Sequence, residues 1–175
     1  MLFIPDWLTS IFTFPGVIVH EWAHKKFCDL FGVRVYKVVY FQPKNLAGYV
    51  THERVSGAWA NFWISFGPLM INSVLGVGLG YAAAVAPFAS AWKFVLLWLA
   101  FSVGARAFPS DQDALNVVVS GKEGFWRNGS LLGLLAYPLF VLVWLANKLR
   151  FFWFDYLYAV ALIVVAYSLR NYGIL

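Results

Sequence analysis

The chain has 175 residues, of which 62% are hydrophobic and 12% charged, and its formal net charge is +5. Soluble domains carry about 25% charged residues, so this composition excludes an ordinary soluble protein and indicates that lipid surrounds most of the surface. The single cysteine, Cys28, excludes an internal disulfide. No basic stripe lies on a soluble face, so nucleic acid is not an expected partner.

Five apolar stretches predict transmembrane helices, because crossing a bilayer takes about 20 residues. The expected fold class is therefore an all-α integral membrane protein, a single domain over residues 1–175. Its core would cover about residues 10–120, and a C-terminal helical hairpin about 130–170. The stretches run approximately over Trp7–Leu30, Ala58–Ala86, Ala89–Phe108, Ser130–Asn147 and Phe151–Leu169. Pro15-Gly16 breaks the first, and Gly67-Pro68 lies inside the second.

A different pattern lies between the first two stretches. Val33 to Phe41 is rich in β-branched and aromatic residues, Pro43-Lys44-Asn45 is a turn signal, and Ala47 to Glu53 is again strand-like. The pattern predicts a small β-hairpin between helices one and two. An open sheet edge in lipid would leave backbone polar groups unpaired, so we expect the hairpin at the membrane interface or against protein.

Two shorter patterns follow the hairpin. Gly76, Gly78 and Gly80 lack the strand–turn–helix context of a nucleotide-binding loop, and small residues four apart predict a close helix–helix contact instead. Asp111 to Ser120 is amphipathic, and we expect it to form a helix at the membrane surface.

The basic residues predict the topology. With five spans, ten Lys and Arg residues fall on the hairpin side and three on the other. Because cytoplasmic loops carry the excess of positive charge, the multi-pass chain should have its N-terminus outside and its hairpin in the cytoplasm. The ten are Lys25, Lys26, Arg34, Lys37, Lys44, Arg54, Arg106, Lys122, Arg127 and Arg170, and the three are Lys93, Lys148 and Arg150.

The first apolar stretch contains the motif His20-Glu21-Trp22-Ala23-His24. Histidines four residues apart project from one helix face and can bind one metal ion. Zinc lowers the pKa of a bound water to about 7, and the neighbouring Glu21 can take its proton. Ionisable groups in a hydrophobic span are costly and usually functional, which favours a site with one zinc per chain, near the cytoplasmic side, over a structural cluster or a degenerate site.

A catalytic zinc usually has three protein ligands, so a third residue is needed. Asp111 and Asp113 follow Pro109-Ser110 at the cytoplasmic end of the third stretch, at the depth of the two histidines. We favour Asp113, because Asp111 is placed to stabilise the start of the next helix. His52 and Cys28 are the remaining alternatives, although we favour a strand-end histidine at an interface and a buried core thiol as the interpretations of these two residues.

Together these motifs resemble the site-2 protease family, the intramembrane zinc metalloproteases. His20 to His24 lie in a predicted membrane helix, as the family's HExxH does, and Phe66 to Asn72 is similar to its Gly-Pro-x-x-Asn segment, with the Asn one residue further on. Pro109 to Ala114 stands where the family has an Asp-Gly motif that supplies the third ligand, with Ala114 in place of Gly. The resemblance covers about residues 10–120 and is to a small, divergent, prokaryotic-type member.

The resemblance implies an endopeptidase of a prokaryotic cell membrane that hydrolyses peptide bonds of membrane-anchored proteins. The roles it implies are zinc binding by His20, His24 and Asp113, general-base catalysis by Glu21, and binding of an unwound substrate strand by Asn72, Gly48 and Tyr49. Two alternatives of other classes are a catalytically silent scaffold that binds membrane proteins and a zinc hydrolase of a lipid or small molecule.

Overall fold

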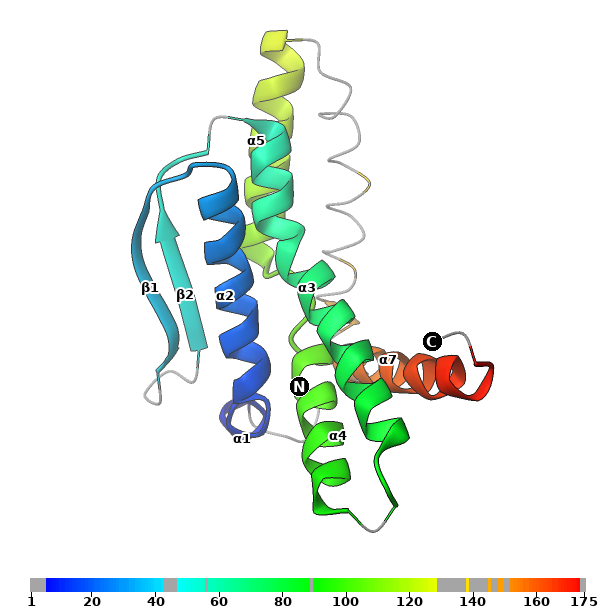
Figure 1. Ribbon diagram of the computed structural model, residues 1–175. Coiled ribbons are helices and arrows are strands. Elements are labelled where there is room, and N and C mark those ends of the chain that lie inside the picture. The colour runs from blue at the N-terminus through cyan, green and yellow to red at the C-terminus, as the bar shows by residue number, and fades with distance from the viewer. Residues whose placement is uncertain are drawn as a thin grey trace.

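A computed structural model describes residues 6–42, 47–55, 57–88, 90–128 and 152–173, with single positions at 138, 145, 148 and 149. The described chain is mostly helical with one two-stranded antiparallel hairpin, which confirms the coarse fold class (Figure 1). The elements are α1 (Asp6–Phe12), α2 (Phe14–Leu30), β1 (Val35–Gln42), β2 (Ala47–His52), α3 (Ala58–Val85), α4 (Ala91–Gly104), α5 (Asp111–Asn128) and α7 (Phe154–Asn171).

The first apolar stretch forms two helices, where the sequence predicts one retained span. α1 ends at Phe12 and α2 begins at Phe14, and Figure 1 shows α1 turned away from the axis of α2. The break lies before Pro15-Gly16, the pair at which the sequence predicts it. Pro15 falls in the first turn of α2, and a proline is tolerated there because backbone N–H groups of the first turn have no partner within the helix. α2 alone has 17 residues.

The start of α2 is fixed against the end of α4. The backbone N–H of Gly16 donates a hydrogen bond of 2.9 Å to Ser102 Oγ, which supplies a partner for an N–H that has none within α2. A Cβ at position 16 would overlap the backbone of Ser102. Glycine is therefore what lets these two helices approach so closely.

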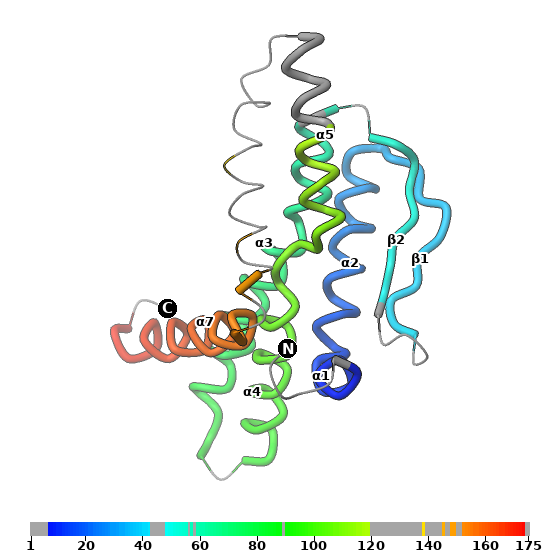
Figure 2. Tube along the Cα trace, turned by 180° about the vertical axis from the view of Figure 1, so that it is seen from behind, coloured from blue at the N-terminus to red at the C-terminus, as the bar shows by residue number. Residues whose placement is uncertain are grey.

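The hairpin forms where the sequence predicts it and lies against protein. β1 and β2 are antiparallel, with Val38 opposite Val50 and Val39 opposite Tyr49, and both strands run alongside α2 (Figures 1 and 2). The turn residues 43–46 lie outside the described residues. We expected the hairpin at the membrane interface or against protein, and its packing on α2 is the second of these placements.

α3 is the helix of the described chain that is long and apolar enough to cross a membrane, over Trp59–Val85. α4 is apolar but has 14 residues, about 21 Å at 1.5 Å per residue, whereas the hydrocarbon core is about 30 Å thick. Among the described residues, length and composition thus support one of the expected spans. The fourth, 130–147, lies outside the described residues except at positions 138 and 145.

The last two described helices take unexpected directions. α5 extends to Asn128, and it runs alongside the first half of α3, with Ala114 and Val117 packed on Phe66. α7 corresponds to the fifth expected span, but Figure 2 shows it running across α3 and α4 instead of alongside them. The five predicted spans are therefore not confirmed by the described helices.

α7 crosses α3 and α4 at small residues. A Cβ added at Gly80 would lie 2.9 Å from Ala166 Cβ, and one at Gly104 would lie 3.0 Å from the backbone of Ala159. Gly78 has nothing within 4 Å. The close helix contact expected from glycines four residues apart is thus confirmed at Gly80, and at Gly76, which faces Leu162 of α7.

We predict that Gly80→Val destabilises the protein by about 1–3 kcal/mol, because the added methyl groups overpack a buried contact. The matched control is Gly78→Val, which lies on the same helix in open space and should change stability by less than about 0.5 kcal/mol. Unfolding in detergent micelles followed by circular dichroism measures both. Equal stability of the two variants would show that α7 does not pack on Gly80.

Candidate metal centre

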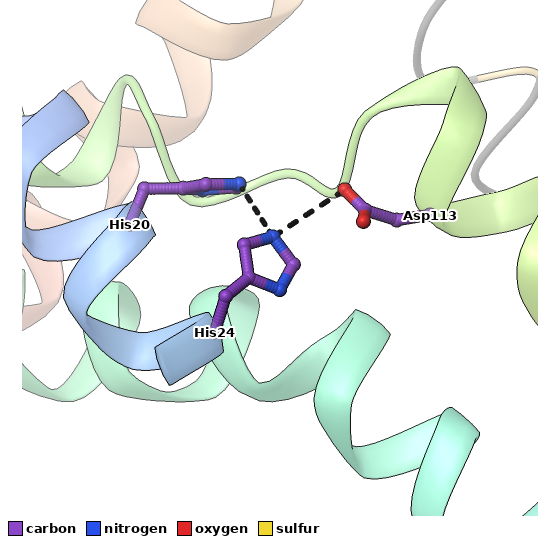
Figure 3. A group of neighbouring side chains, drawn as sticks. All are labelled: His20, His24 and Asp113. Carbon is purple, nitrogen blue, oxygen red and sulfur yellow. Dashed lines mark hydrogen bonds and ion pairs between the residues drawn. The ribbon is translucent and has the colours of Figure 1, made fainter. Parts of the chain in front are cut away.

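Three of the predicted site residues lie together in the structure. His20 and His24 project from one face of α2, and Asp113 comes from the first turn of α5 (Figure 3). Their candidate ligand atoms all lie within 4.8 Å of one another, with the two Nε2 atoms 3.2 Å apart and His24 Nε2 3.5 Å from Asp113 Oδ2. This group could hold a metal ion.

Both imidazole rings are oriented by backbone carbonyls. His20 Nδ1 lies 2.8 Å from the carbonyl oxygen of Arg106, and His24 Nδ1 lies 2.8 Å from that of Ile64. A carbonyl oxygen can only accept a hydrogen bond, so each Nδ1 carries the hydrogen. In the neutral rings each Nε2 then presents its lone pair to the centre of the group, which is the tautomer that binds a metal.

The resulting arrangement favours a cation. The two Nε2 atoms lie 3.2 Å apart beside a carboxylate, and positive charge between them, from a proton or from a metal ion, stabilises this arrangement. Around a tetrahedral zinc with bonds of about 2.0–2.1 Å, neighbouring ligand atoms lie about 3.3–3.4 Å apart. Two of the separations, 3.2 and 3.5 Å, are close to that spacing, whereas the ligand atoms of His20 and Asp113 are up to 4.8 Å apart. The group could hold a metal ion, and zinc would have to draw His20 and Asp113 closer together.

Asp113 is also part of a helix cap. Its Oδ2 accepts hydrogen bonds from the backbone N–H of Ser110 at 2.8 Å and from Ser110 Oγ at 2.6 Å, and Ser110 Oγ accepts one from the Asp113 N–H at 3.2 Å. This is a reciprocal capping box, with Asp113 in the usual place of a Glu. Ser110 and Asp113 therefore cap the start of α5, and Asp111 lies exposed in the same first turn.

The predicted general base, Glu21, lies beneath the hairpin. It is buried, and a Cβ added at Gly48 of β2 would overlap the Glu21 side chain. The carboxylate is within electrostatic reach of His24 and Asp113. Gly48, which the resemblance assigns to substrate binding, is therefore the point at which the hairpin closes over the base.

A groove lined by both polar and apolar residues runs along β2 from Tyr49 onward. It has a volume of about 430 Å³. Asn116, one turn after Asp113 on α5, forms part of the opposite wall, and Asn61 of α3 donates a hydrogen bond of 2.7 Å to the Asn116 carbonyl. Tyr49, the other hairpin residue assigned to substrate, lines the groove. The complete lining is Tyr49, Val50, Thr51, His52, Glu53, Arg54, Val55, Asn61, Asn116 and Val119.

Asn72 is the third residue that the resemblance assigns to substrate binding. Its side chain has no exposed surface, and its Nδ2 donates hydrogen bonds to the carbonyls of Val103 at 3.1 Å and Arg106 at 2.9 Å. A side chain enclosed in this way does not line the groove beside β2, and its contact with a substrate stays a prediction. Asn72 holds the turn that follows α4, which carries the carbonyl bound to His20.

The alternative third ligands lie outside the group. Cys28 is fully buried among Phe27 and Ile64, which agrees with its interpretation as a core thiol. His52 lies in the groove, with its Nδ1 2.8 Å from the Glu53 carbonyl oxygen. Within the described chain, the one cluster of three potential metal ligands is His20, His24 and Asp113.

No protein-family model matches this chain, and neither a curated protein nor a solved structure does. The likeness to site-2 proteases therefore rests on the sequence motifs alone.

We predict that Asp113→Asn loses zinc, because an amide is a far poorer zinc ligand than a carboxylate. The Asn oxygen can still accept hydrogen bonds from Ser110, so the helix cap should survive. Asp111→Asn is the matched control and should keep its zinc while losing about 0.3–1 kcal/mol of stability from the helix terminus. Elemental analysis of the purified variants measures zinc per chain, and the opposite pattern would make Asp111 the ligand.

Proposed function

We propose that this protein is a membrane-embedded zinc endopeptidase related to the site-2 proteases. The observation that carries the proposal is the His20, His24 and Asp113 group, with its Nε2 lone pairs converging beside the buried Glu21. A zinc ion held by these three residues would supply a Lewis acid and a water that loses a proton readily near neutral pH.

Different residues of the chain then transfer the proton and position the metal ligands. Glu21 is adjacent to His20 on α2 and covered by Gly48, so it has little competing water. We assign to it the transfer of a proton from the attacking water to the leaving amine. The carbonyls of Arg106 and Ile64 keep both imidazoles in the ligating tautomer. Ser110 holds Asp113 through two hydrogen bonds.

The groove beside β2 is the proposed substrate site. One edge of β2 pairs with β1, and an extended peptide can pair with the other edge by strand addition. The groove begins at Tyr49, next to the residue that covers Glu21, and passes Asn116 one turn from Asp113. Because its lining includes His52, Glu53 and Arg54, we expect the bound segment to be unwound and polar rather than helical and apolar.

The membrane arrangement belongs to the same proposal. α3 provides one helix long and apolar enough to cross a bilayer. We propose a multi-pass protein of a prokaryotic cell membrane with its N-terminus outside and its metal centre near the cytoplasmic side, on the strength of the excess of basic residues around α2 and the hairpin. Water would reach the metal centre from that side.

The direct test of catalysis is Glu21→Gln. The variant keeps the three ligands, so zinc per chain should be unchanged, whereas cleavage of a membrane-anchored reporter should fall by about 10²–10⁴-fold, the usual contribution of a general base. Reporter cleavage in reconstituted vesicles, followed by gel mobility, measures this. Full cleavage by Glu21→Gln would remove Glu21 from the mechanism, and parent protein that binds zinc but cleaves no membrane-anchored protein would favour the scaffold or lipid-hydrolase alternatives.

The groove predicts where a substrate is held. In the Glu21→Gln background, a photoreactive phenylalanine analogue at Val119, which lines the groove, should crosslink to a membrane-anchored substrate. The same analogue at Trp92, an exposed position on α4 outside the groove lining, is the control and should give little product. Equal crosslinking at both positions would argue against the groove as the substrate site.

A further inference from the structure

We propose that the Gly67–Asn72 segment of α3 positions both histidine ligands. Pro68 leaves the Ile64 carbonyl available to His24, and Asn72 fixes the Arg106 carbonyl that binds His20. The proposal rests on the zinc site argued above. It gives this segment a role in metal affinity, where the resemblance suggests contact with substrate.

Pro68 accounts for the carbonyl that orients His24. A proline inside a helix has no N–H for the carbonyl four residues earlier, and its ring pushes that carbonyl away from the helix axis. In α3 the residue four before Pro68 is Ile64, whose carbonyl is the one that accepts the His24 Nδ1–H at 2.8 Å. The proline thus leaves one backbone acceptor unclaimed within α3, and His24 uses it.

Gly67 lets α2 come close enough for that contact. A Cβ at position 67 would overlap the ring of Phe27, which lies on α2 one turn beyond His24. Any larger residue at 67 would therefore have to displace the Phe27 ring or push α2 away from α3. Because a hydrogen bond weakens steeply beyond its normal range, the His24–Ile64 contact depends on this glycine.

Asn72 completes the segment on the His20 side. Its Nδ2 bonds to the carbonyls of Arg106 and Val103 at the end of α4, and the Arg106 carbonyl also accepts the His20 Nδ1–H. The Asn72 Oδ1 is buried with no hydrogen-bond partner among the described residues. Burying the Asn72 Oδ1 without a partner costs free energy. We attribute the choice of Asn at this position to the hydrogen bonds that its Nδ2 donates to the Val103 and Arg106 carbonyls.

The three positions share one face of α3. Ile64, Pro68 and Asn72 are four residues apart, so they lie one turn above the other, and all three side chains are almost fully buried. His20 and His24 have the same spacing on α2. One face of α3 therefore serves both rings, directly at Ile64 and through Arg106 at Asn72.

The experiment measures zinc affinity by chelator competition together with the melting temperature of the metal-free protein. In Pro68→Ala the new N–H can bond to the Ile64 carbonyl and draw it back toward the helix axis. Zinc affinity should then fall by about 10–100-fold, the usual effect of removing an outer partner of a ligand, without a fall in melting temperature, since a helix-interior proline disfavours the helix. Pro87→Ala, an exposed proline beyond α3, is the control and should leave affinity unchanged.

The second arm tests Asn72. Asn72→Leu should lower zinc affinity and change the visible spectrum of the cobalt-loaded protein, because His20 is no longer held. Ser73→Ala, its neighbour on α3, removes hydrogen bonds to Leu69 and Tyr158 and should leave affinity and spectrum unchanged. Should Asn72→Leu fail to fold, Thr13→Val provides the milder test, because Thr13 Oγ1 accepts a bond of 2.8 Å from the Arg106 side chain and its loss should also weaken zinc binding.

Parental zinc affinity and an unchanged cobalt spectrum in Pro68→Ala and in the Asn72 or Thr13 variant would overturn the proposal. The proposed function fails in a different way. If the parent binds no zinc, or if His20→Ala and His24→Ala bind as much as the parent, the site itself is wrong. A parent whose zinc depends on both histidines but not on Pro68 or Asn72 would refute the positioning role alone.

Discussion

Two imidazole nitrogens that lie 3.2 Å apart form the constraint on which the rest of this structure depends. The arrangement is stabilised by a proton or a metal ion between them, and both rings are held from behind by the carbonyls of Arg106 and Ile64. Asp113 adds a carboxylate on the third side. The free energy of the folded state is thereby linked to metal binding, since a bound ion stabilises only the conformation in which these groups converge.

The candidate metal centre is built where helices are interrupted. Continuous helices satisfy their own backbone groups, so only ends and breaks offer free carbonyls and N–H groups. Pro68 breaks the hydrogen-bond ladder of α3 at Ile64, α4 ends just before Arg106, and α5 begins at the Ser110–Asp113 capping box. Three interruptions in different helices thus supply the two carbonyls and the carboxylate around one point on α2.

Local patterns in the sequence predicted the parts of the fold that depend on near neighbours. The spacing of His20 and His24 places both on one helix face, and the alternation of β-branched residues predicted the hairpin that β1 and β2 form. The long apolar run predicted α3. The Ser110–Asp113 capping box could also have been predicted from its Ser-x-x-acid pattern. That pattern would have given the capping role to Asp113.

The remaining features depend on contacts between residues far apart in the chain. The direction of α7 follows from small residues such as Gly80 meeting Ala166, a pairing that no local pattern contains. Asn72 was assigned to substrate from its motif, because nothing near it in the sequence shows that the end of α4 encloses it. In the same way, only the packing of the hairpin on α2 reveals that Gly48 covers Glu21.

The most direct test of the account is X-ray absorption spectroscopy of the purified protein loaded with one equivalent of zinc. The geometry around His20, His24 and Asp113 predicts a first shell of nitrogen and oxygen atoms at about 2.0–2.2 Å, with the outer scattering of two imidazole rings. A sulfur scatterer at about 2.3 Å would place the ion on Cys28. A spectrum without imidazole scattering would contradict the metal centre described here.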